Sequence, residues 1–233
     1  MTSLLHYASD GHISTITLDD GKANALSVEM LTQLNTALDR AESDRCAVLI
    51  TGREGMFSGG FDLAVFRSER DQVFRMLKAG AEITERLLSF PAPVVGACSG
   101  HAIAMGAFLL LSTDVRIGIK SGAFKIAVNE VQIGMTLPRF AIEVCRQRLT
   151  PAAFSRALIT AEPHDHDRAF DAGFLDYLLP APEFHEGARA RTLALTKLVR
   201  DAYIATKRRV REQTLTALRR AIDLDIADWN ARA

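Results

Sequence analysis

Apolar residues recur along the chain in two alternating patterns. Short apolar runs predict strands over residues 12–18, 46–51, 93–98 and 115–119. Apolar positions at helical spacing predict helices after Ser27, which can cap the first of them, and over 73–88, 105–112, 138–148, from 151 onward and 165–172. Gly80 is expected to be a weak point within its helix. Strands that alternate with helices predict βαβ units and a largely parallel sheet, so the fold class is α/β.

The last part of the chain follows a different pattern. From Glu186 onward no strand pattern is visible, and the segment is rich in Ala, Leu and Arg. This composition predicts two or three amphipathic helices. We therefore expect an α/β core over residues 1–183 and a C-terminal helical region over 184–233.

The charge and composition of the chain argue against several classes of protein. The chain has 233 residues, 48% of them hydrophobic, and its 28 Lys and Arg residues balance 28 Asp and Glu residues. This composition excludes a disordered chain, and the absence of a cationic surplus argues against general nucleic-acid binding. No apolar run approaches the roughly 18 residues of a membrane span, and residues 1–10 lack a secretory signal pattern. We expect a globular, cytoplasmic protein without a nucleic-acid or membrane partner.

Cysteine and histidine positions favour structural roles over metal binding. Cys46, Cys98 and Cys145 are unclustered and odd in number, which predicts buried thiols in a reducing compartment and no disulfide framework. The run 164–167 (His-Asp-His-Asp) has a metal-like appearance but lacks a third patterned ligand, so a helix cap with solvated acids is the simpler interpretation. We predict no metal site.

Two glycine loops that follow buried strands are the candidates for chemistry. The first contains Gly59 and Gly60, and the second runs from Gly100 to Phe108. Glycine permits a backbone geometry that leaves the next N–H free, and the N–H of Met105 would lie in the first turn of an apolar helix. Two such N–H groups would form an oxyanion hole. Taken alone, the pattern is that of a tight turn in most proteins.

Both loops together, in this order and spacing, resemble the crotonase superfamily, also called the enoyl-CoA hydratase/isomerase family. The matching segments are residues 24–26 (NAL), 57–63 (FSGGFDL), 93–95 (PVV) with 100–102 (GHA), 114–116 (DVR), 130–138 (EVQIGMTLP) and 172–176 (AGFLD). The resemblance implies a crotonase-like (ββα)n spiral with mostly parallel sheets. It also implies a C-terminal helical region that serves trimerisation and covers coenzyme A, in a homotrimer or dimer of trimers.

The resemblance also implies how a substrate is held. The carbonyl oxygen of an acyl-CoA thioester would accept hydrogen bonds from the backbone N–H groups of Phe61 and Met105, which stabilise an enolate. Coenzyme A would arrive as part of the substrate rather than as a separate cofactor. Its adenine and pantetheine would lie along the first strand–helix turn and the first glycine loop, at Lys22, Ala23, Ala25, Gly59 and Gly60. From the residues alone, Lys22 is equally a solvated surface lysine.

One motif position separates the activities within the family. Hydratases of the family use two glutamates, and the corresponding positions here are Phe108 and Glu130. Adding water requires an oriented water molecule with a proton relay, whereas moving a double bond requires one base. The single Glu130 therefore favours double-bond isomerisation of an enoyl-CoA. The alternatives are an enoyl-CoA hydratase, in which His101 or an ordered water replaces the missing carboxylate, and a catalytically silent acyl-CoA-binding protein.

Further residues have alternative interpretations. Phe66, Met105 and Phe108 are expected to wall the acyl pocket, and His101 either lines it or is a structural histidine. Lys207, in the basic run 207–211, either contacts the coenzyme A phosphates or belongs to a solvated helix face. Asp62 is expected to order its loop, and Asp176 to approach the site. Outside the family frame, Glu130 is a surface carboxylate before a turn.

Overall fold

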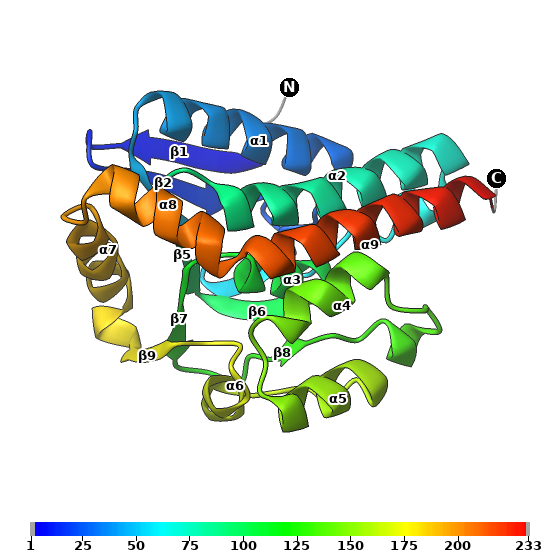
Figure 1. Cartoon of the computed structure of the whole chain (residues 1–233). Helices are drawn as coiled ribbons and strands as arrows, with labels where there is room; N and C mark the ends of the chain where they lie inside the picture. The colour runs from blue at the N-terminus through cyan, green and yellow to red at the C-terminus, as the bar shows by residue number, and fades with distance from the viewer. Residues whose placement is uncertain (1–2, 232–233) are drawn as a thin grey trace.

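A six-stranded sheet forms the centre of the computed structural model, which describes residues 3–231 (Figure 1). The strand order is β1-β2-β3-β5-β7-β9; β1 pairs antiparallel with β2, and the other neighbours pair in parallel. The prediction of a largely parallel sheet is confirmed. The strands are β1 (Leu5–Ser9), β2 (Ile13–Leu18), β3 (Ala47–Gly52), β5 (Val94–Cys98), β7 (Val115–Lys120) and β9 (Tyr177–Pro180).

A second, three-stranded sheet lies beyond the carboxyl ends of the central strands. It consists of β4 (Gly55–Ser58), β6 (Gly100–Ile103) and β8 (Ile126–Ala127), all parallel. The sequence predicts loops here, and the structure instead shows short strands. The backbones of β4 and β6 approach closely, since a Cβ on Gly100 would lie 1.9 Å from the Gly55 carbonyl carbon. Two strands thus precede each of the first four α-helices, which confirms the ββα spiral.

The helices of the described residues cover both faces of the central sheet. The caps predicted at Ser27 and in the run 164–167 are observed, and Thr150 is a further cap: the side chains of Ser27, Asp165 and Thr150 each accept a hydrogen bond from a backbone N–H of the first turn. The helices are α1 (Val28–Ser43), α2 (Arg70–Ser89), α3 (Met105–Leu111), α4 (Arg139–Arg146), α5 (Pro151–Ile159), α6 (His166–Ala172), α7 (Phe184–Leu195), α8 (Arg200–Val210) and α9 (Glu212–Ala231), with short 3-10 turns at η1 (Val65–Arg67), η2 (Val131–Ile133) and η3 (Ala181–Glu183).

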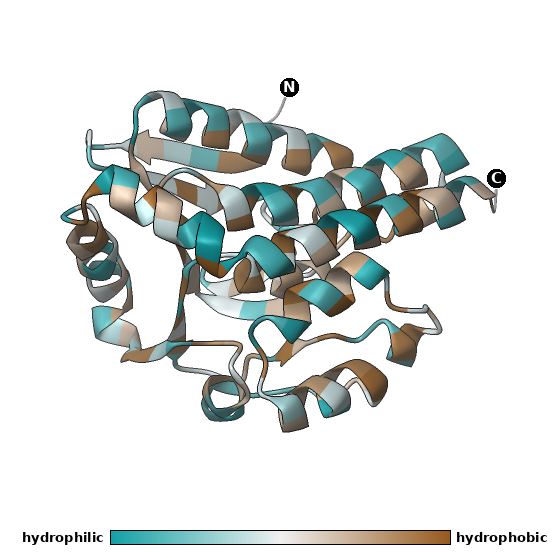
Figure 2. Ribbon diagram, viewed as in Figure 1, coloured by the Kyte–Doolittle hydropathy of each residue, from teal (hydrophilic) through white to brown (hydrophobic). Residues whose placement is uncertain are grey.

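The C-terminal region is helical, as predicted, and packs into the core. Phe184 and Ala188 of α7 join a buried cluster on one face of the sheet. Helix α9 runs alongside α2 and α4 (Figure 1), and its Leu218 and Ile222 belong to the main core. Figure 2 shows hydrophobic and hydrophilic residues alternating along these helices, as an amphipathic helix requires. A role of this region in trimerisation or in covering coenzyme A stays a prediction.

Helix α9 also fixes the start of α4. The buried carboxylate of Asp225 accepts hydrogen bonds from the backbone N–H groups of Arg139 (3.0 Å) and Phe140 (2.9 Å). These N–H groups belong to the first turn of α4 and have no intrahelical acceptor. Since the segment that leads into α4 carries Glu130, the C-terminal helix supports the region of the predicted site.

Two further predictions from the sequence concern the state of the cysteines and the presence of membrane-spanning helices. Cys46, Cys98 and Cys145 are free and buried, as expected. Burial raises the pKa of Cys98 to about 12, so this thiol is unreactive at neutral pH. Among the helices of residues 3–231, none has the length and apolar character needed to cross a membrane.

Candidate active site

A buried asparagine holds the first turn against the first glycine segment. The side-chain amide of Asn24 donates hydrogen bonds to the carbonyl oxygens of Leu18 (2.8 Å), Met56 (3.0 Å) and Phe57 (3.1 Å). Its own backbone has a left-handed φ of 51°, which asparagine tolerates better than most residues. The sequence identifies Asn24 only as part of a motif. Its linking role was missed because these hydrogen-bond partners lie in two separate strands.

Two glycines let the glycine segments meet. The N–H of Gly59 donates to the carbonyl oxygen of Ala23 (2.7 Å), and the carbonyl oxygen of Gly60 accepts from the N–H of Leu26 (2.8 Å). Gly60 has a φ of 93°, and a Cβ on it would lie 2.8 Å from the carbonyl oxygen of Ile103. A side chain at this position would therefore push the second segment away. The same Cβ would lie 3.4 Å from the backbone nitrogen of Met105.

Two backbone N–H groups are left without acceptors at this junction. Within residues 3–231, neither the N–H of Phe61 nor that of Met105 donates a hydrogen bond to another protein group. Met105 is the first residue of α3, and Ala104 before it holds a φ of 49°, which is unusual for a residue with a side chain. Strained backbone of this kind is common at ligand sites. The two groups are free to donate to a bound oxygen atom.

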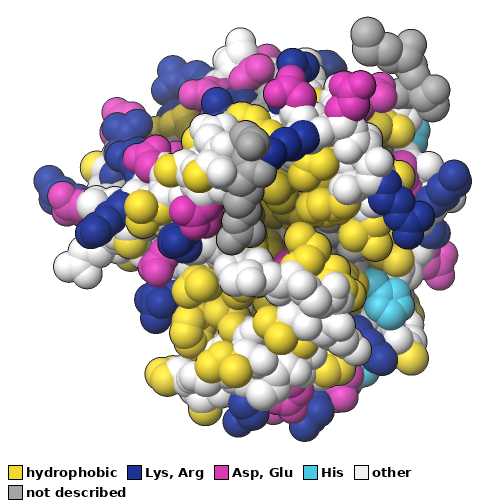
Figure 3. All heavy atoms as spheres, turned by 90° about the vertical axis from the view of Figure 1, so that its right-hand side faces the viewer, with side chains coloured by type: hydrophobic (Ala, Val, Ile, Leu, Met, Phe, Trp, Pro, Cys, Tyr) yellow, Lys and Arg dark blue, Asp and Glu magenta, His cyan; other side chains and the backbone are white. Residues whose placement is uncertain are grey.

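A small, mainly apolar pocket opens beside these N–H groups. Its volume is about 90 Å³. Figure 3 shows hydrophobic side chains gathered around a hollow on the face where α2 begins and α9 ends. Glu130 is the one acidic residue among the lining residues that the structure describes. The pocket is lined by Gly59, Phe61, Leu63, Phe66, Leu77, Ile103, Ala104, Phe108, Asn129, Glu130, Ile133, Met135 and Pro138.

Glu130 is a buried carboxyl group rather than a surface acid. It lies just before η2 and is 6% exposed. Burial raises its pKa from the ordinary 4.5 to about 7, because the charged form loses hydration. Its Oε2 is buried and has no hydrogen-bond partner among the described residues. Such a group can accept a proton from a ligand near neutral pH and give it back.

Two expected pocket walls are present, and a third is elsewhere. Phe66 and Phe108 line the pocket, and the ring of Phe108 packs edge-on against Phe140 with their centroids 6.1 Å apart. The side chain of Met105 does not line it. Its sulfur packs toward Gly80 of α2, where an added Cβ would lie 3.4 Å away. The expectation that the Met105 side chain walls the pocket is therefore wrong, although its backbone is at the junction.

Gly80 is also where the sequence prediction for α2 fails. The helix continues through this residue without a break. A Cβ on Gly80 would lie 2.4 Å from Cζ of Phe61, so the aromatic ring occupies the space that a side chain would need. The glycine that was expected to weaken the helix instead gives room to a pocket wall.

The first turn lies on the open side of the first glycine segment. Lys22 and Ala23 are exposed and Ala25 is half-buried, next to Gly59 in space. The carbonyl oxygen of Lys22 accepts a hydrogen bond from Nε of Arg53 (2.7 Å), which holds the turn in place. The predicted coenzyme A positions are thus brought together on one surface.

His101 does not reach the pocket. Its Nδ1 accepts a hydrogen bond from the backbone N–H of Lys125 (3.0 Å), and its side chain borders a different cavity, near Phe124 and His185. The expectation that His101 lines the acyl pocket is wrong. The alternative interpretation as a structural histidine fits this hydrogen bond.

Lys207 is also remote from the pocket. Its side chain is 5% exposed, and Nζ donates to the carboxylate of Asp114 (2.8 Å) and to the carbonyl oxygen of Ala92 (3.3 Å). Burial lowers its pKa to about 8, and the Asp114 carboxylate opposes this shift. An ammonium group held inside the protein is not available to a phosphate in solution. The expected contact between Lys207 and coenzyme A is therefore replaced by a structural ion pair.

The remaining acidic candidates have structural partners. Asp176 forms an ion pair with the buried guanidinium of Arg116 instead of approaching the pocket. Asp62 accepts a hydrogen bond from the N–H of Ala64 (2.9 Å) and orders its loop, as expected. Asp165 caps α6, and nowhere between residues 3 and 231 do three His, Cys, Asp or Glu side chains group as a metal ion would require.

Comparisons with known proteins agree with this architecture. A family model for enoyl-CoA hydratase/isomerase matches residues 9–230. A probable enoyl-CoA hydratase from Bacillus subtilis is 31% identical over 173 residues, which cover 72% of this chain and 66% of the relative. An enoyl-CoA hydratase/isomerase family protein from Pseudomonas syringae has a TM-score of 0.93 and 43% identity, over 96% of this chain and 97% of the other.

A solved structure of an enoyl-CoA isomerase from Mycobacterium tuberculosis is about as similar to this chain as the Pseudomonas syringae structure is. Its TM-score is 0.92 and its identity 41%, over 97% of this chain and 99% of the other. The family model spans nearly the whole chain, and the neighbouring structures share the spiral of paired strands and helices. The chain therefore belongs to the enoyl-CoA hydratase/isomerase family of enzymes, the crotonase superfamily.

Proposed function

We propose that this protein is an enoyl-CoA isomerase that moves a double bond from C3 to C2 of an acyl-CoA thioester. The observation that carries the proposal is the single buried carboxyl group, Glu130, in a mainly apolar pocket beside two free backbone N–H groups. A base with a pKa of about 7 is suited to both removing and returning a proton at neutral pH.

The reaction needs one base and one oxyanion hole. The thioester oxygen accepts hydrogen bonds from the N–H groups of Phe61 and Met105, each of which contributes about 3 kcal/mol to the stability of the transition state. Glu130 removes a proton from C2, and the electrons of that C–H bond form a dienolate with the negative charge on the thioester oxygen. The protonated Glu130 then returns the proton to C4. The C3–C4 double bond becomes a C2–C3 double bond, and no atom is gained or lost.

The hydratase alternative has less support from the pocket. Adding water to the C2–C3 double bond requires a water molecule held by polar groups and a route for its second proton. At the position where the family's hydratases have a second glutamate, this chain has Phe108, which is 1% exposed and packed against another ring. His101, the suggested substitute for that carboxylate, borders a different cavity.

The substrate's coenzyme A moiety is proposed to lie along Lys22, Ala23, Ala25 and Gly59, with no separate cofactor. A cytoplasmic homotrimer or dimer of trimers is proposed from the family resemblance. Exposed apolar residues of η2 and α5 give such an assembly a surface to bury, since Val131 is 48% and Ile159 is 71% exposed.

The test uses two substrates of matched chain length, trans-3-enoyl-CoA and trans-2-enoyl-CoA, followed by the absorbance of the conjugated thioester. We expect absorbance to rise with the 3-enoyl substrate and to stay constant with the 2-enoyl substrate. Loss of the 2-enoyl signal would show hydration. Binding of both without any change would show a silent acyl-CoA-binding protein. Either result would overturn the proposal.

The matching variant is Glu130→Gln, which keeps the shape of the side chain and removes the base. We expect the isomerisation rate to fall by about 10²–10⁴-fold while the thioester still binds. The control is Glu82→Gln on the exposed side of α2, which should leave the rate unchanged. An unchanged rate in Glu130→Gln would exclude Glu130 as the base.

A further inference from the structure

A second cavity lies at the opposite end of the central sheet from the proposed active site. It is bordered by residues at or just before the amino ends of three strands, namely His12 before β2, Ala47 at the start of β3 and Pro93 before β5. Its volume is about 260 Å³. The proposed active site follows the carboxyl ends of β3 and β5. Since β3 has 6 residues, the two ends of that strand are about 17 Å apart.

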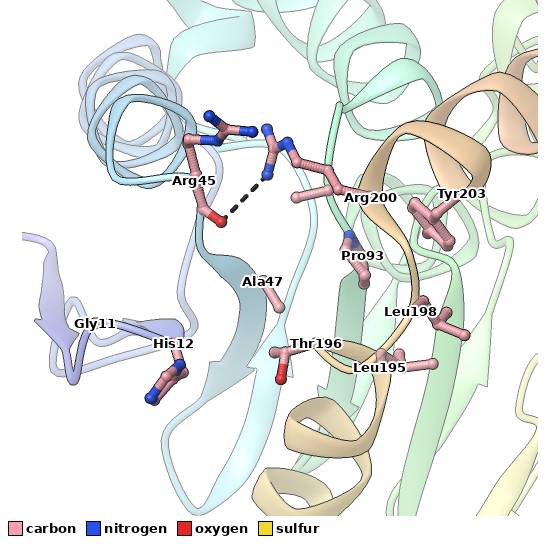
Figure 4. A pocket seen from close by; sticks show the side chains of 11 residues that line it. Gly11, His12, Arg45, Ala47, Pro93, Leu195, Thr196, Leu198, Arg200 and Tyr203 are labelled. Atoms are coloured by element: carbon pink, nitrogen blue, oxygen red, sulfur yellow. Dashed lines mark hydrogen bonds between the residues drawn. The ribbon is translucent and has the colours of Figure 1, made fainter.

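The rim of this cavity carries two arginines without a counter-ion. The guanidinium of Arg200 donates to the backbone carbonyl oxygen of Arg45 (3.2 Å), and Figure 4 shows both guanidinium groups pointing toward one another. Neither Arg45 nor Arg200 forms an ion pair with a carboxylate in the part of the chain that the structure describes. Among residues 3–231, no acidic residue lines the cavity. Two like charges that face one another without a counter-ion favour the binding of an anion.

Positive charge continues behind the cavity wall. Tyr203 and Ala92 line the cavity, and both contact the buried cluster around Asp114: Tyr203 donates to its carboxylate (2.7 Å), and Ala92 accepts from Lys207. In that cluster the cations outnumber the carboxylates, with Lys207, Arg211, Arg116 and Arg148 against Asp114 and Asp176. Nε and Nη1 of Arg116 and Nε of Arg148 are buried and lack hydrogen-bond partners among the described residues.

The floor of the cavity is apolar. Ala47, Pro93, Leu195 and Leu198 contribute hydrocarbon surface below the two arginines (Figure 4), and Ala92 also lines the cavity. A bare inorganic anion would leave this surface without a partner. A guanidinium group pairs well with the planar carboxylate, through two parallel N–H···O bonds. The combination fits a carboxylate head with a short hydrocarbon body.

Arg45 occupies a position where glycine is usual. It follows α1 with a left-handed φ of 56° and is therefore in the conformation that ends many helices at glycine. An arginine here costs about 1 kcal/mol of strain relative to glycine. Replacing it with glycine should therefore leave the fold intact, which makes Arg45→Gly a suitable test variant.

We infer that the cavity between the amino ends of β2, β3 and β5 and the start of α8 is a binding site for a small organic carboxylate. Arg45 and Arg200 hold the carboxylate, and the hydrocarbon body lies over Ala47, Pro93 and Leu198. The site is separate from the enoyl-CoA pocket, so the inference does not depend on the reaction that the protein catalyses.

The experiment is calorimetric titration of the full chain with hexanoate, hexanamide and inorganic phosphate at constant ionic strength. We expect hexanoate to bind at least tenfold more tightly than either of the other two, because hexanamide lacks the charge and phosphate lacks the hydrocarbon body. Arg45→Gly and Arg200→Gln should each weaken hexanoate binding at least tenfold. The control Arg209→Gln, an exposed arginine of α8 outside the cavity, should not.

Three results would overturn the inference. Equal affinity for hexanoate and hexanamide would show that the arginines do not hold the carboxylate. Equal affinity for hexanoate and phosphate would show that the hydrocarbon surface is not used. Retention of hexanoate binding in the Arg45→Gly, Arg200→Gln double variant would assign that binding to another place, and an unchanged circular dichroism spectrum would show that the double variant is folded.

Discussion

The proposed role of Glu130 as the base predicts the pH dependence of catalysis. The group acts as a base only when it has lost its proton, and burial raises its pKa to about 7. We therefore expect kcat/KM for the 3-enoyl substrate to rise with pH and to level off above about pH 7. Measurement of kcat/KM from pH 5 to 9 would test this expectation. A profile that levels off near pH 4.5 would mean that the carboxyl group is hydrated in solution.

The same residue should reduce stability at neutral and higher pH. Between pH 4.5 and about 7, the folded chain keeps a proton on Glu130 that the unfolded chain has lost, so the free energy of unfolding falls as pH rises. The full loss is about 3 kcal/mol. Glu130→Gln should therefore be more stable than the original chain at pH 8 and similar to it near pH 4.5. Urea unfolding at the two pH values would measure both differences, and an equal effect at both would contradict the buried-acid interpretation.

At the level of single residues, motif spacing predicts which residues gather at the pocket better than it predicts the contacts of each side chain. Glu130, Phe108 and the two glycine segments are predicted from motif spacing, and the structure gathers them around one pocket. His101 and Lys207 are misassigned, because a motif position does not reveal which face of a strand or helix a side chain is on, or whether a half-buried carboxylate such as Asp114 already binds it. The structural role of Asn24 was missed for a related reason, because it consists of hydrogen bonds to backbone groups that are distant in the sequence.

Helix α2 and the loop that carries Phe61 pack closely against one another. Gly80 leaves space for the Phe61 ring, and the backbone of Phe61 supplies one of the two proposed oxyanion donors. Gly80→Ala would favour the helix by about 1 kcal/mol, but its Cβ would displace the ring and with it the donor. We expect kcat/KM to fall at least tenfold without global unfolding, as measured by steady-state kinetics and circular dichroism.

The control for this variant is Gly187→Ala in α7. An added Cβ there would also meet a side chain, Cδ1 of Leu179 at 2.7 Å, but far from the enoyl-CoA pocket. The end of a leucine side chain can move aside, so activity should be unchanged. Equal losses in both variants would show that a general packing defect, rather than the position of Phe61, is responsible.

Among the elements, those with a buried face were predictable and those at the edges were not. Strands β3 and β5 are continuous apolar runs that are buried throughout, and α1 has a regular apolar stripe behind a capping serine. Strands β1 and β9 are the edges of the sheet and carry exposed residues, so their hydrophobic pattern is weak. Strand β4 starts at Gly55 and is followed by Gly59 and Gly60, so its sequence is typical of a loop; Gly100 of β6 is the glycine that lets the two backbones approach.

On the scale of the whole molecule, one carboxylate connects the C-terminal helices to the central sheet. Asp114 directly precedes β7, and its side chain accepts a hydrogen bond from the N–H of Val94 in β5 (2.8 Å). It also pairs with Lys207 of α8 (2.8 Å) and with Arg211 between α8 and α9 (2.6 Å). Both cations are buried, so each depends on this carboxylate for its charge partner.

Asp114→Asn should therefore loosen the C-terminal helices. Removing one partner of a buried ion pair typically costs about 3–5 kcal/mol, because the remaining charge is left uncompensated. Urea unfolding should show a loss of this size, and hydrogen exchange should show its earliest increase in α8. The control is Asp71→Asn, whose carboxylate pairs with Arg75 on the surface and should contribute little. Unchanged exchange in α8 of Asp114→Asn would mean that apolar packing alone holds these helices to the sheet.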